Sequence, residues 1–207
     1  MKGRFITIEG SEGAGKSTAV KHIVETLEQR QVDHIMTREP GGEENGEKIR
    51  SILLDSEHLQ ANTELLLMFA ARNEHLHKVI RPALSAGHWV LSDRFVDASY
   101  AYQSGGRGID RGILDYLNHW IVADTQPDLT FLLDVDPRVG INRIAGRNHK
   151  DRIEQERIQF FENIRNAYLE LAQQHPGRIV VIDANRPQSE VCAEVIDKLN
   201  RFIDEHA

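Results

Sequence analysis

Five short apolar runs recur along the chain, and the segments between them carry apolar residues at helical spacing. Runs rich in β-branched residues and bounded by turn residues predict strands. These strands are expected at residues 4–10, 34–38, 88–93, 129–136 and 178–184. Helices are expected at residues 16–30, 47–54, 63–71, 110–123, 137–145, 158–171 and 191–203. Strands that alternate with helices indicate an α/β fold with a parallel sheet covered on both faces. Ligands bind at the carboxyl ends of such strands.

Three features of the pattern predict where elements begin or end. The segment 63–71 is apolar almost all round, which predicts a central helix, and the polar residues 72–74 indicate its end. Pro82 is expected to begin a new helical segment, because its missing N–H does no harm in a first turn. The glycines within residues 105–108 predict a flexible loop.

Composition and charge narrow the class of protein. The chain has 207 residues, 40% hydrophobic and 28% charged, which fits one globular domain over 1–207. A net charge of -7 argues against nucleic acid and anionic membranes as partners. With a single cysteine, Cys192, no internal disulfide is expected, which fits a reducing cytoplasm. No apolar run approaches the ~20 residues of a membrane span, and the first residues do not resemble a signal peptide.

The clearest motif is a glycine-rich loop between the first predicted strand and the first predicted helix. Residues 10–17 match G-x-x-x-x-G-K-[ST] in full. Glycines let successive N–H groups point at phosphate oxygens, and the following helix adds its N-terminal dipole. Lys16 is expected to contact the β- and γ-phosphates of ATP, and the Ser17 hydroxyl to face Mg²⁺. The expected ATP-binding residues are Gly10, Ser11, Glu12, Gly13, Ala14, Gly15, Lys16, Ser17 and Thr18. The alternative is a glycine-rich turn without a ligand.

Other features separate this chain from the larger classes of P-loop proteins. It has no guanine-reading Asn-Lys-x-Asp motif, which argues against a GTPase. Asp93 and Asp134 end predicted strands without a following Glu, unlike the acidic pair typical of motor ATPases. The modest size and the basic segment 143–152 favour a small kinase with a lid.

Seven blocks spread over nearly the whole chain resemble the bacterial thymidylate kinase family, in the family's order. They are FITIEGSEGAGKST (5–18), TREPGG (37–42), EKIRSILL (47–54), LLLMFAAR (65–72), DRFVDASYAYQSGGRGI (93–109), PDLTFLLDVDP (127–137) and DRIEQE (151–156). The resemblance implies a P-loop three-layer α/β/α fold with a five-stranded parallel sheet and a short lid at about 143–153. It also implies the reaction ATP + dTMP → ADP + dTDP, with Mg²⁺ as cofactor, in a cytoplasmic homodimer.

The resemblance assigns the phosphates to charged residues at the predicted strand ends. Arg94 is expected to hold the dTMP phosphate and to bridge to the γ-phosphate, with an ion pair to Asp93 or Glu39 as the alternative. Asp93 is expected to order Mg²⁺. Asp134 competes for this role, and the residues alone favour neither. The family's monophosphate-side cluster corresponds to Arg38, Glu39 and Arg50. For Arg50, a solvated helix face is the alternative.

The resemblance also assigns the nucleoside of dTMP. Glu12 is expected to accept a hydrogen bond from the sugar 3′-hydroxyl, which accounts for a carboxylate inside a phosphate loop. Gln103 and Ser99 are expected to read the thymine edge, and Arg72 to contact a base carbonyl. Tyr102 is expected to crowd the sugar 2′ position against a ribonucleotide. The alternatives are a solvent-facing Glu12 and a Tyr102 that only packs in the core.

One departure from the family concerns the residue that stacks on the base. Many relatives carry a phenylalanine four residues before the arginine that corresponds to Arg72, whereas this chain has Met68 there and Phe69 one residue later. We expect Phe69 to stack on thymine, because an aromatic face suits a base. A structural role for Phe69 in the core is the alternative.

The basic segment 143–152 is expected to act as a lid. The phosphate loop has no basic residue before Lys16, so a further cation must come from elsewhere. Arg147 and Arg152 are the expected donors on lid closure and, with Lys16 and Arg94, the expected catalytic residues. The alternative is a surface loop without a catalytic role.

Two rival functions stay open at this point. One is a kinase for another pyrimidine monophosphate or a deoxynucleoside, because one sequence does not fully separate dTMP from dUMP. The other is a regulator that binds nucleotide without phosphoryl transfer, although the intact Lys16, Arg94 and basic lid weigh against it.

Overall fold

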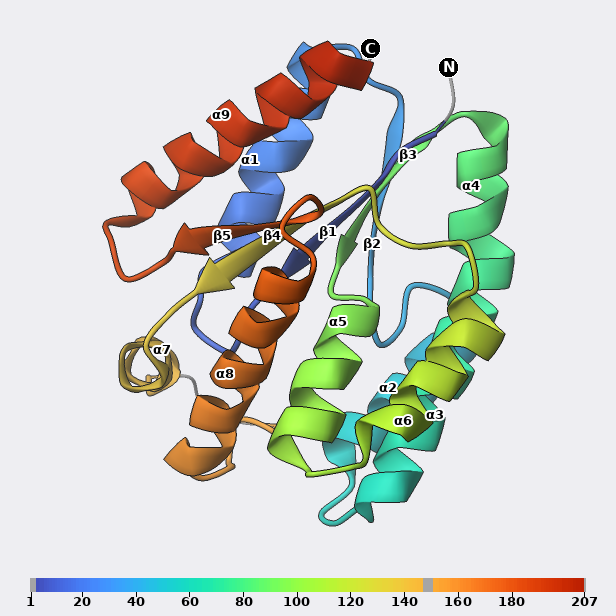
Figure 1. The fold of residues 1–207 in the computed structure, drawn as a ribbon, viewed down its shortest axis with the longest axis vertical. Helices are drawn as coiled ribbons and strands as arrows, with labels where there is room; N and C mark the ends of the chain where they lie inside the picture. Colours follow the sequence, from blue (N-terminus) through green and yellow to red (C-terminus); the bar gives the residue numbers. More distant parts are fainter. Residues whose placement is uncertain (1–2, 147–150, 207) are drawn as a thin grey trace.

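A five-stranded parallel sheet forms the centre of the molecule, in the order β2-β3-β1-β4-β5 (Figure 1). We describe it from a computed structural model that covers residues 3–146 and 151–206. The strands are β1 (Phe5–Glu9), β2 (His34–Arg38), β3 (Trp89–Asp93), β4 (Leu129–Asp134) and β5 (Ile179–Asp183). All four strand pairings are parallel. The expected α/β fold with five parallel strands is therefore confirmed.

Helices cover both faces of this sheet. They are α1 (Lys16–Gln29), α2 (Glu44–Asp55), α3 (Ala61–His75), α4 (Arg81–Ala86), α5 (Val96–Ser99), α6 (Arg111–Leu117), α7 (Pro137–Ile144), α8 (Ile158–Gln174) and α9 (Gln188–His206). Three π-helical segments lie between them, at η1 (Leu76–Ile80), η2 (Tyr100–Gly106) and η3 (Asn118–Val122). None of the helices in the described ranges is long and apolar enough to cross a bilayer.

Alternation along β1 divides the core into two layers. Ile6 and Ile8 point to one face of the sheet, where they pack with α1 and α9. Phe5 points to the other face, where it packs with residues of α3, α5 and α8. All three side chains are buried. A strand that is buried on both faces has to be apolar almost throughout. A central strand such as β1 is therefore recognisable in the sequence as an apolar run.

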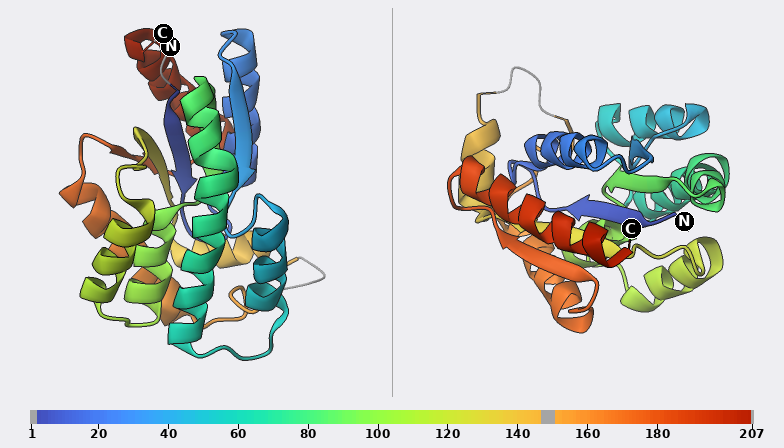
Figure 2. Two further views of the ribbon diagram at one scale, coloured as in Figure 1. Left: turned by 90° about the vertical axis from the view of Figure 1, so that its right-hand side faces the viewer. Right: turned by 90° about the horizontal axis from the view of Figure 1, so that it is seen from above.

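The break expected after residue 71 is wrong. Helix α3 continues through η1 into α4, so residues 61–86 form one long helix (Figure 2, left). Arg72 does not end the helix because its guanidinium is buried and fully engaged. The wider π-helical turn η1 ends two residues before Pro82, which lies in the first turn of α4, and it covers the carbonyl four residues earlier that a proline ring would crowd in a regular α-helix.

The flexible loop expected at residues 105–108 is also corrected. Gly105 and Gly106 belong to η2, which packs closely on α8. A Cβ at Gly105 would lie 2.6 Å from the Cβ of Ala167, and one at Gly106 would lie 2.5 Å from the Phe160 ring. Gly105 and Gly106 therefore serve close packing, whereas Gly108 lies beyond η2 with a φ of 73° and open space around it, as a loop glycine does.

A buried carboxyl group lies where β1 meets the phosphate loop. Glu9 accepts hydrogen bonds from the Phe95 amide and the Tyr168 hydroxyl, both at 2.7 Å. Burial, followed by the charge of Asp97, raises the pKa of Glu9 from 4.5 to about 8. Because the folded pKa lies above the unfolded one, Glu9 stabilises the fold at low pH and loses that effect as pH rises from 4.5 to 8.

We therefore expect Glu9→Gln to stabilise the protein relative to the natural chain at pH 8 but not at pH 5. The margin should reach a few kcal/mol, or roughly 10 °C in Tm. Thermal unfolding between pH 5 and pH 8 measures it, with the exposed Glu44→Gln as the matched control. A Tm difference that stays constant across this range would contradict the raised pKa.

Candidate active site

The carboxyl ends of β1 and β3 bring the glycine-rich loop beside Arg94. The loop adopts backbone angles that favour glycine, with φ of 141° at Gly10, 73° at Gly13 and 94° at Gly15. A Cβ at Gly13 would also lie 2.1 Å from the Gly140 carbonyl oxygen. The spacing of the motif is thus required by the backbone, and α1 begins directly after the loop.

Lys16 folds back over the loop that precedes it. Its ammonium donates to the carbonyls of Gly10 at 2.8 Å and Ser11 at 3.1 Å, and the residue is buried. Burial, followed by the charge of Arg94, lowers the pKa of Lys16 to about 8. The site therefore holds a cation that an incoming phosphate would stabilise further.

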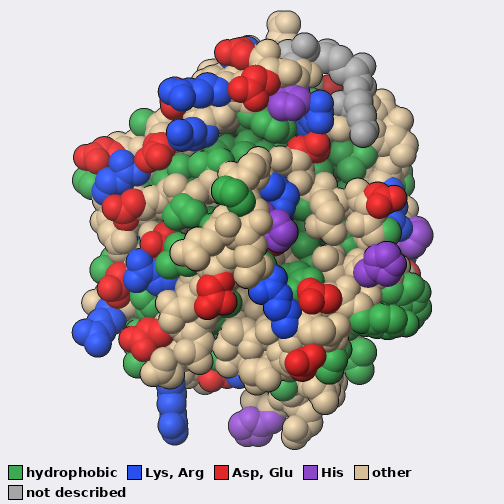
Figure 3. All heavy atoms as spheres, viewed as in Figure 1, with side chains coloured by type: hydrophobic (Ala, Val, Ile, Leu, Met, Phe, Trp, Pro, Cys, Tyr) green, Lys and Arg blue, Asp and Glu red, His purple; other side chains and the backbone are tan. Residues whose placement is uncertain are grey.

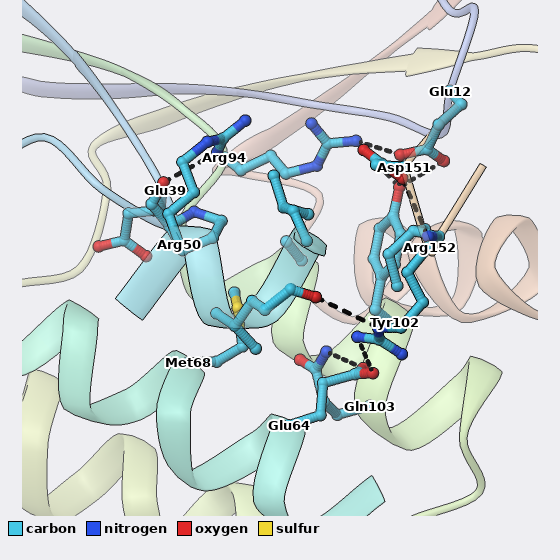
Figure 4. Close-up of a pocket in the computed structure, with 15 residues that line it drawn as sticks. Glu12, Glu39, Arg50, Glu64, Met68, Arg94, Tyr102, Gln103, Asp151 and Arg152 are labelled. Atoms are coloured by element: carbon cyan, nitrogen blue, oxygen red, sulfur yellow. Dashed lines mark hydrogen bonds and ion pairs between the residues drawn. The ribbon is translucent and has the colours of Figure 1, made fainter. Parts of the chain in front are cut away.

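Arg94, Glu12 and Tyr102 form one hydrogen-bonded group (Figure 4). Arg94 Nη2 donates to Glu12 Oε1 at 2.7 Å and to the Tyr102 hydroxyl at 3.0 Å. The Tyr102 hydroxyl lies 2.8 Å from both Glu12 oxygens. Burial opposes the charge of Arg94, but Tyr102, Glu12 and Asp93 together hold its pKa above the ordinary value. Arg94 is thus a fixed cation at the junction of loop and β3.

The two acids at strand ends differ in their partners. Asp134 accepts from Arg165 through both oxygens, at 2.6 and 2.8 Å. Asp93 Oδ1 is buried without a hydrogen-bond partner among the described residues, and it lies 3.9 Å from Arg94 Nη1. Mg²⁺ bound to nucleotide needs only one or two carboxylates besides water and phosphate oxygens. The Asp93 oxygen, which forms no hydrogen bond among the described residues, fits that need, whereas both oxygens of Asp134 already accept from Arg165.

A cavity opens beside this group, between α2, α3 and η2 (Figure 4). We call it the central cavity. Its lining residues are Glu12, Glu39, Pro40, Arg50, Leu53, Leu54, Glu64, Met68, Arg94, Ala98, Tyr102, Gln103, Asp151, Arg152 and Ile153. Of the residues expected to bind dTMP, Glu12, Arg94, Tyr102 and Gln103 all line this cavity. Met68 lines it as well.

Several expected residues lie behind this wall instead. Arg72 is completely buried and donates to Glu39 at 2.8 Å, to the Ser99 hydroxyl at 2.9 Å and to the Phe95 carbonyl at 3.0 Å. Phe69 is buried under the Arg72 guanidinium, 4.8 Å from ring centre to Cζ. Neither they nor Ser99 lines the central cavity. Met68 takes the wall position that we expected Phe69 to hold.

Arginines approach the Pro40 side of the cavity. Arg50 lines it and donates to the Pro40 carbonyl at 2.9 Å, directly after the cis Glu39-Pro40 bond. Arg38 does not line the cavity and pairs with Glu47 at 2.9 Å. Like charges of Arg38 and Arg94 contribute to lowering the pKa of Arg50, after burial. The three arginines therefore gather positive charge at one end of the cavity.

Glu64 lines this cavity although no motif in the sequence had indicated it, whereas Arg152, which also lines the cavity, was expected as a lid residue. Glu64 is 2% exposed although it stands in an apolar helix, and Arg152 donates to it at 2.7 Å. Arg152 also donates to the Leu53 carbonyl at 3.2 Å, so this arginine lies on the cavity wall. His75, buried behind the wall, binds Glu39 at 3.0 Å and Thr37 at 2.6 Å. A buried glutamate is recognisable only from partners distant in sequence. Arg147 lies outside the described residues.

A second hollow flanks the opposite side of the phosphate loop. Its lining residues are Gly13, Ala14, Gly15, Arg143, Ala184, Arg186, Gln188, Val191 and Cys192. Arg143 donates to the carbonyls of Gly13 at 3.2 Å and Ala184 at 3.0 Å. The turn after β5 thus lies beside the phosphate loop, which no motif in that segment had indicated.

Comparisons with known proteins agree on one family. The family model described as thymidylate kinase matches residues 8–195. A thymidylate kinase of Methylobacillus flagellatus is 50% identical, over 98% of this chain and 99% of its own. That of Methylococcus capsulatus is 48% identical over 99% and 98% of the two chains, and that of Nitrosospira multiformis is 51% identical over 92% and 94%. With the phosphate loop and the central cavity in one molecule, the chain belongs to the thymidylate kinase family.

Proposed function

We propose that the chain transfers the γ-phosphoryl group of ATP to dTMP and releases ADP and dTDP. The observation that supports this reaction best is the position of Arg94: it lines the central cavity and donates to Glu12 of the phosphate loop. Two nucleotides bound on either side would meet end to end there. An acceptor phosphate is already anionic, so the site needs no strong base. Its task is positioning and charge neutralisation.

On the donor side, residues 10–18 bind the phosphates of ATP. The loop amides and Lys16 contact the β- and γ-phosphates, and the hollow beside Arg143 accommodates the base. Ser17 and Asp93 hold Mg²⁺, which neutralises charge on the transferred group when bound. The buried Asp93 Oδ1, which has no hydrogen-bond partner in the part of the chain that the structure describes, supports this assignment. Among the described residues, no cluster of three or more acidic, His or Cys ligands suggests another metal site.

On the acceptor side, the central cavity binds dTMP. Arg50 and Arg94 hold its phosphate, with Arg38 adding charge from outside the wall. Glu12 accepts from the 3′-hydroxyl, and Tyr102, held against Glu12, limits the space at the 2′ position. The base lies against Met68, while Gln103 meets its edge.

The residues behind the wall support those on it. Glu39 is bound by Arg72, which also holds Ser99 in place. Phe69 packs under Arg72. Their contribution to binding dTMP is therefore to fix the wall rather than to touch the base.

Arg152, with Arg147, supplies the cation that the phosphate loop lacks before Lys16. In this structure Arg152 holds the end of the lid segment against Glu64 and Leu53. To reach a phosphate, it exchanges these partners for the nucleotide, which links lid position to substrate binding.

A substrate panel tests the proposed reaction. Initial rates with ATP·Mg²⁺ and dTMP, dUMP, UMP, AMP or thymidine are compared at matched concentrations. We expect dTMP to give the highest kcat/KM and UMP to be poor because of its 2′-hydroxyl. Comparable or faster turnover of UMP, AMP or thymidine would remove the assignment, and binding without any turnover would favour a nucleotide-binding regulator.

We also propose a homodimer that covers an exposed apolar surface on α3, α6 and η3. Leu66, Ile113, Tyr116 and Trp120 are 61%, 49%, 66% and 67% exposed. The rings of Tyr116 and Trp120 lie 6.2 Å apart, and η3 packs against α3. Large apolar side chains gathered on one surface mark an interface.

The double change Tyr116→Glu with Trp120→Glu should therefore give a monomer at micromolar concentration. Sedimentation velocity measures the state, and Val181→Glu, on the exposed side of edge strand β5, is the matched control. A natural chain that sediments as a monomer, or a double variant that still dimerises, would refute this interface.

We place the protein in the cytoplasm. Cys192 is free and buried, so the fold uses no disulfide. Over the face drawn in Figure 3, acidic and basic side chains are interspersed rather than gathered into a broad basic patch. A nucleotide kinase also needs the ATP pool of that compartment.

A further inference from the structure

The carboxamide of Gln103 is buried on the wall of the central cavity with only one of its ends engaged. Its Nε2 donates to Glu64 Oε1 at 2.9 Å. Its Oε1 is buried and has no hydrogen-bond partner among the described residues. Figure 4 shows Gln103 and Glu64 together at the end of the cavity where Met68 also lies. A buried acceptor without a partner is costly, and a donor on a ligand would satisfy it.

Glu64 decides which end of Gln103 is left free. It is 2% exposed. Besides its contact with Gln103, its carboxylate forms ion pairs with Arg107 at 3.2 Å and with Arg152 at 2.7 Å. Burial opposes its charge, but Gln103, Arg107 and Arg152 lower its pKa below the ordinary value. An ionised carboxylate only accepts hydrogen bonds. Gln103 must therefore turn its NH₂ group toward Glu64 and cannot offer that group to a ligand.

We propose that Glu64 is a positioning residue for base specificity: it fixes Gln103 as an acceptor and so selects pyrimidines that carry an N3–H donor. Thymine and uracil present that donor. The N3 of cytosine is itself an acceptor at neutral pH and would face the Gln103 oxygen unpaired. This inference rests on the proposed binding of dTMP in the central cavity, and it assigns Glu64 a role without contact to the reacting atoms.

The nucleotides dUMP and dCMP test this directly, because both lack the 5-methyl group and their bases differ only at N3 and C4. The measured quantity is the ratio of kcat/KM for dUMP to kcat/KM for dCMP. In Glu64→Gln the neighbouring amide can donate as well as accept, so Gln103 is free to reverse. We expect the ratio to fall by roughly 10- to 100-fold in Glu64→Gln. Glu64→Asp keeps the carboxylate and should keep the preference for dUMP.

A double-mutant cycle separates this role from a general effect on the fold or on Arg152. Gln103→Met has nearly the same shape but no hydrogen-bonding group, so it should lower the ratio by itself. In that background Glu64→Gln should change the ratio by less than about threefold. Calorimetric Kd values for dUMP and dCMP give the same comparison where turnover is too slow.

The outcomes separate this inference from the proposed function. If Glu64→Gln lowers both kcat/KM values equally, Glu64 is only structural and the inference is wrong. The same holds if the ratio falls as far in the Gln103→Met background as in the natural one. If the natural chain does not phosphorylate dTMP at all, the proposed function fails first, whatever Glu64 does.

Discussion

Replacing Arg94 by alanine should lower kcat about 10³-fold or more, the scale on which arginines act in phosphoryl transfer. The guanidinium lies where the phosphate loop meets the central cavity, held by Glu12 at 2.7 Å and by the Tyr102 hydroxyl at 3.0 Å. Its backbone has a φ of 69°, and its amide donates to the Ile8 carbonyl at 3.0 Å. Both the backbone and the side chain of Arg94 are therefore held in place.

Two further variants give this prediction its controls. Arg94→Lys keeps the charge but loses the forked geometry, so its kcat should lie between those of the natural chain and the alanine variant. Arg4→Ala removes an arginine that pairs with Asp128 at the opposite end of β1, and it should leave kcat unchanged. Steady-state rates at saturating ATP and dTMP measure all three. A loss below tenfold in Arg94→Ala would mean that Arg94 does not bridge the phosphates.

The sequence predicted best what depends on neighbouring residues. Strand β2 begins and ends where its apolar run does, and the phosphate loop follows from spacing alone, because its glycine backbone angles are local requirements. Every predicted strand pairs in one parallel sheet, and the three central strands β1, β3 and β4, which are buried on both faces, leave the strongest apolar signal. The carboxyl ends of β1 and β3 then bring Lys16 and Arg94 together.

The sequence failed where distant partners change the meaning of a residue. Arg72 indicated a helix end, but Glu39 and Ser99, from two other segments, let it stay buried in the middle of a long helix. The sequence did not single out Glu64, because the partners that neutralise this buried carboxylate, Arg107 and Arg152, lie far along the chain. The choice between Met68 and Phe69 turned on which face of α3 meets the cavity, and the nearly uniform apolar pattern of that helix does not specify a face.

The second large effect concerns Lys16. Lys16→Ala should lower kcat about 10²- to 10³-fold, because a preorganised donor to developing charge is lost. The natural enzyme should also show an alkaline limb in kcat/KM for ATP with a midpoint near 8, the pKa to which burial and Arg94 lower the free ammonium. Below this pH the ammonium is charged and attracts phosphate, and above it the amine is neutral. Bound ATP restores the proton, so kcat at saturation should hold its value to higher pH.

Lys16→Arg distinguishes this titration from others in the same pH range, such as that of Glu9. A guanidinium stays charged throughout, so the variant should be slower overall but should lose the limb near pH 8. Glu9→Gln should keep that limb, because it removes a different buried group, whose pKa is also about 8, and leaves the Lys16 ammonium in place. Persistence of the limb in Lys16→Arg would assign it to a different group. Lys16 would then stay protonated above pH 8. The groups that would stabilise its ammonium are the carbonyls of Gly10 and Ser11, which accept hydrogen bonds from it.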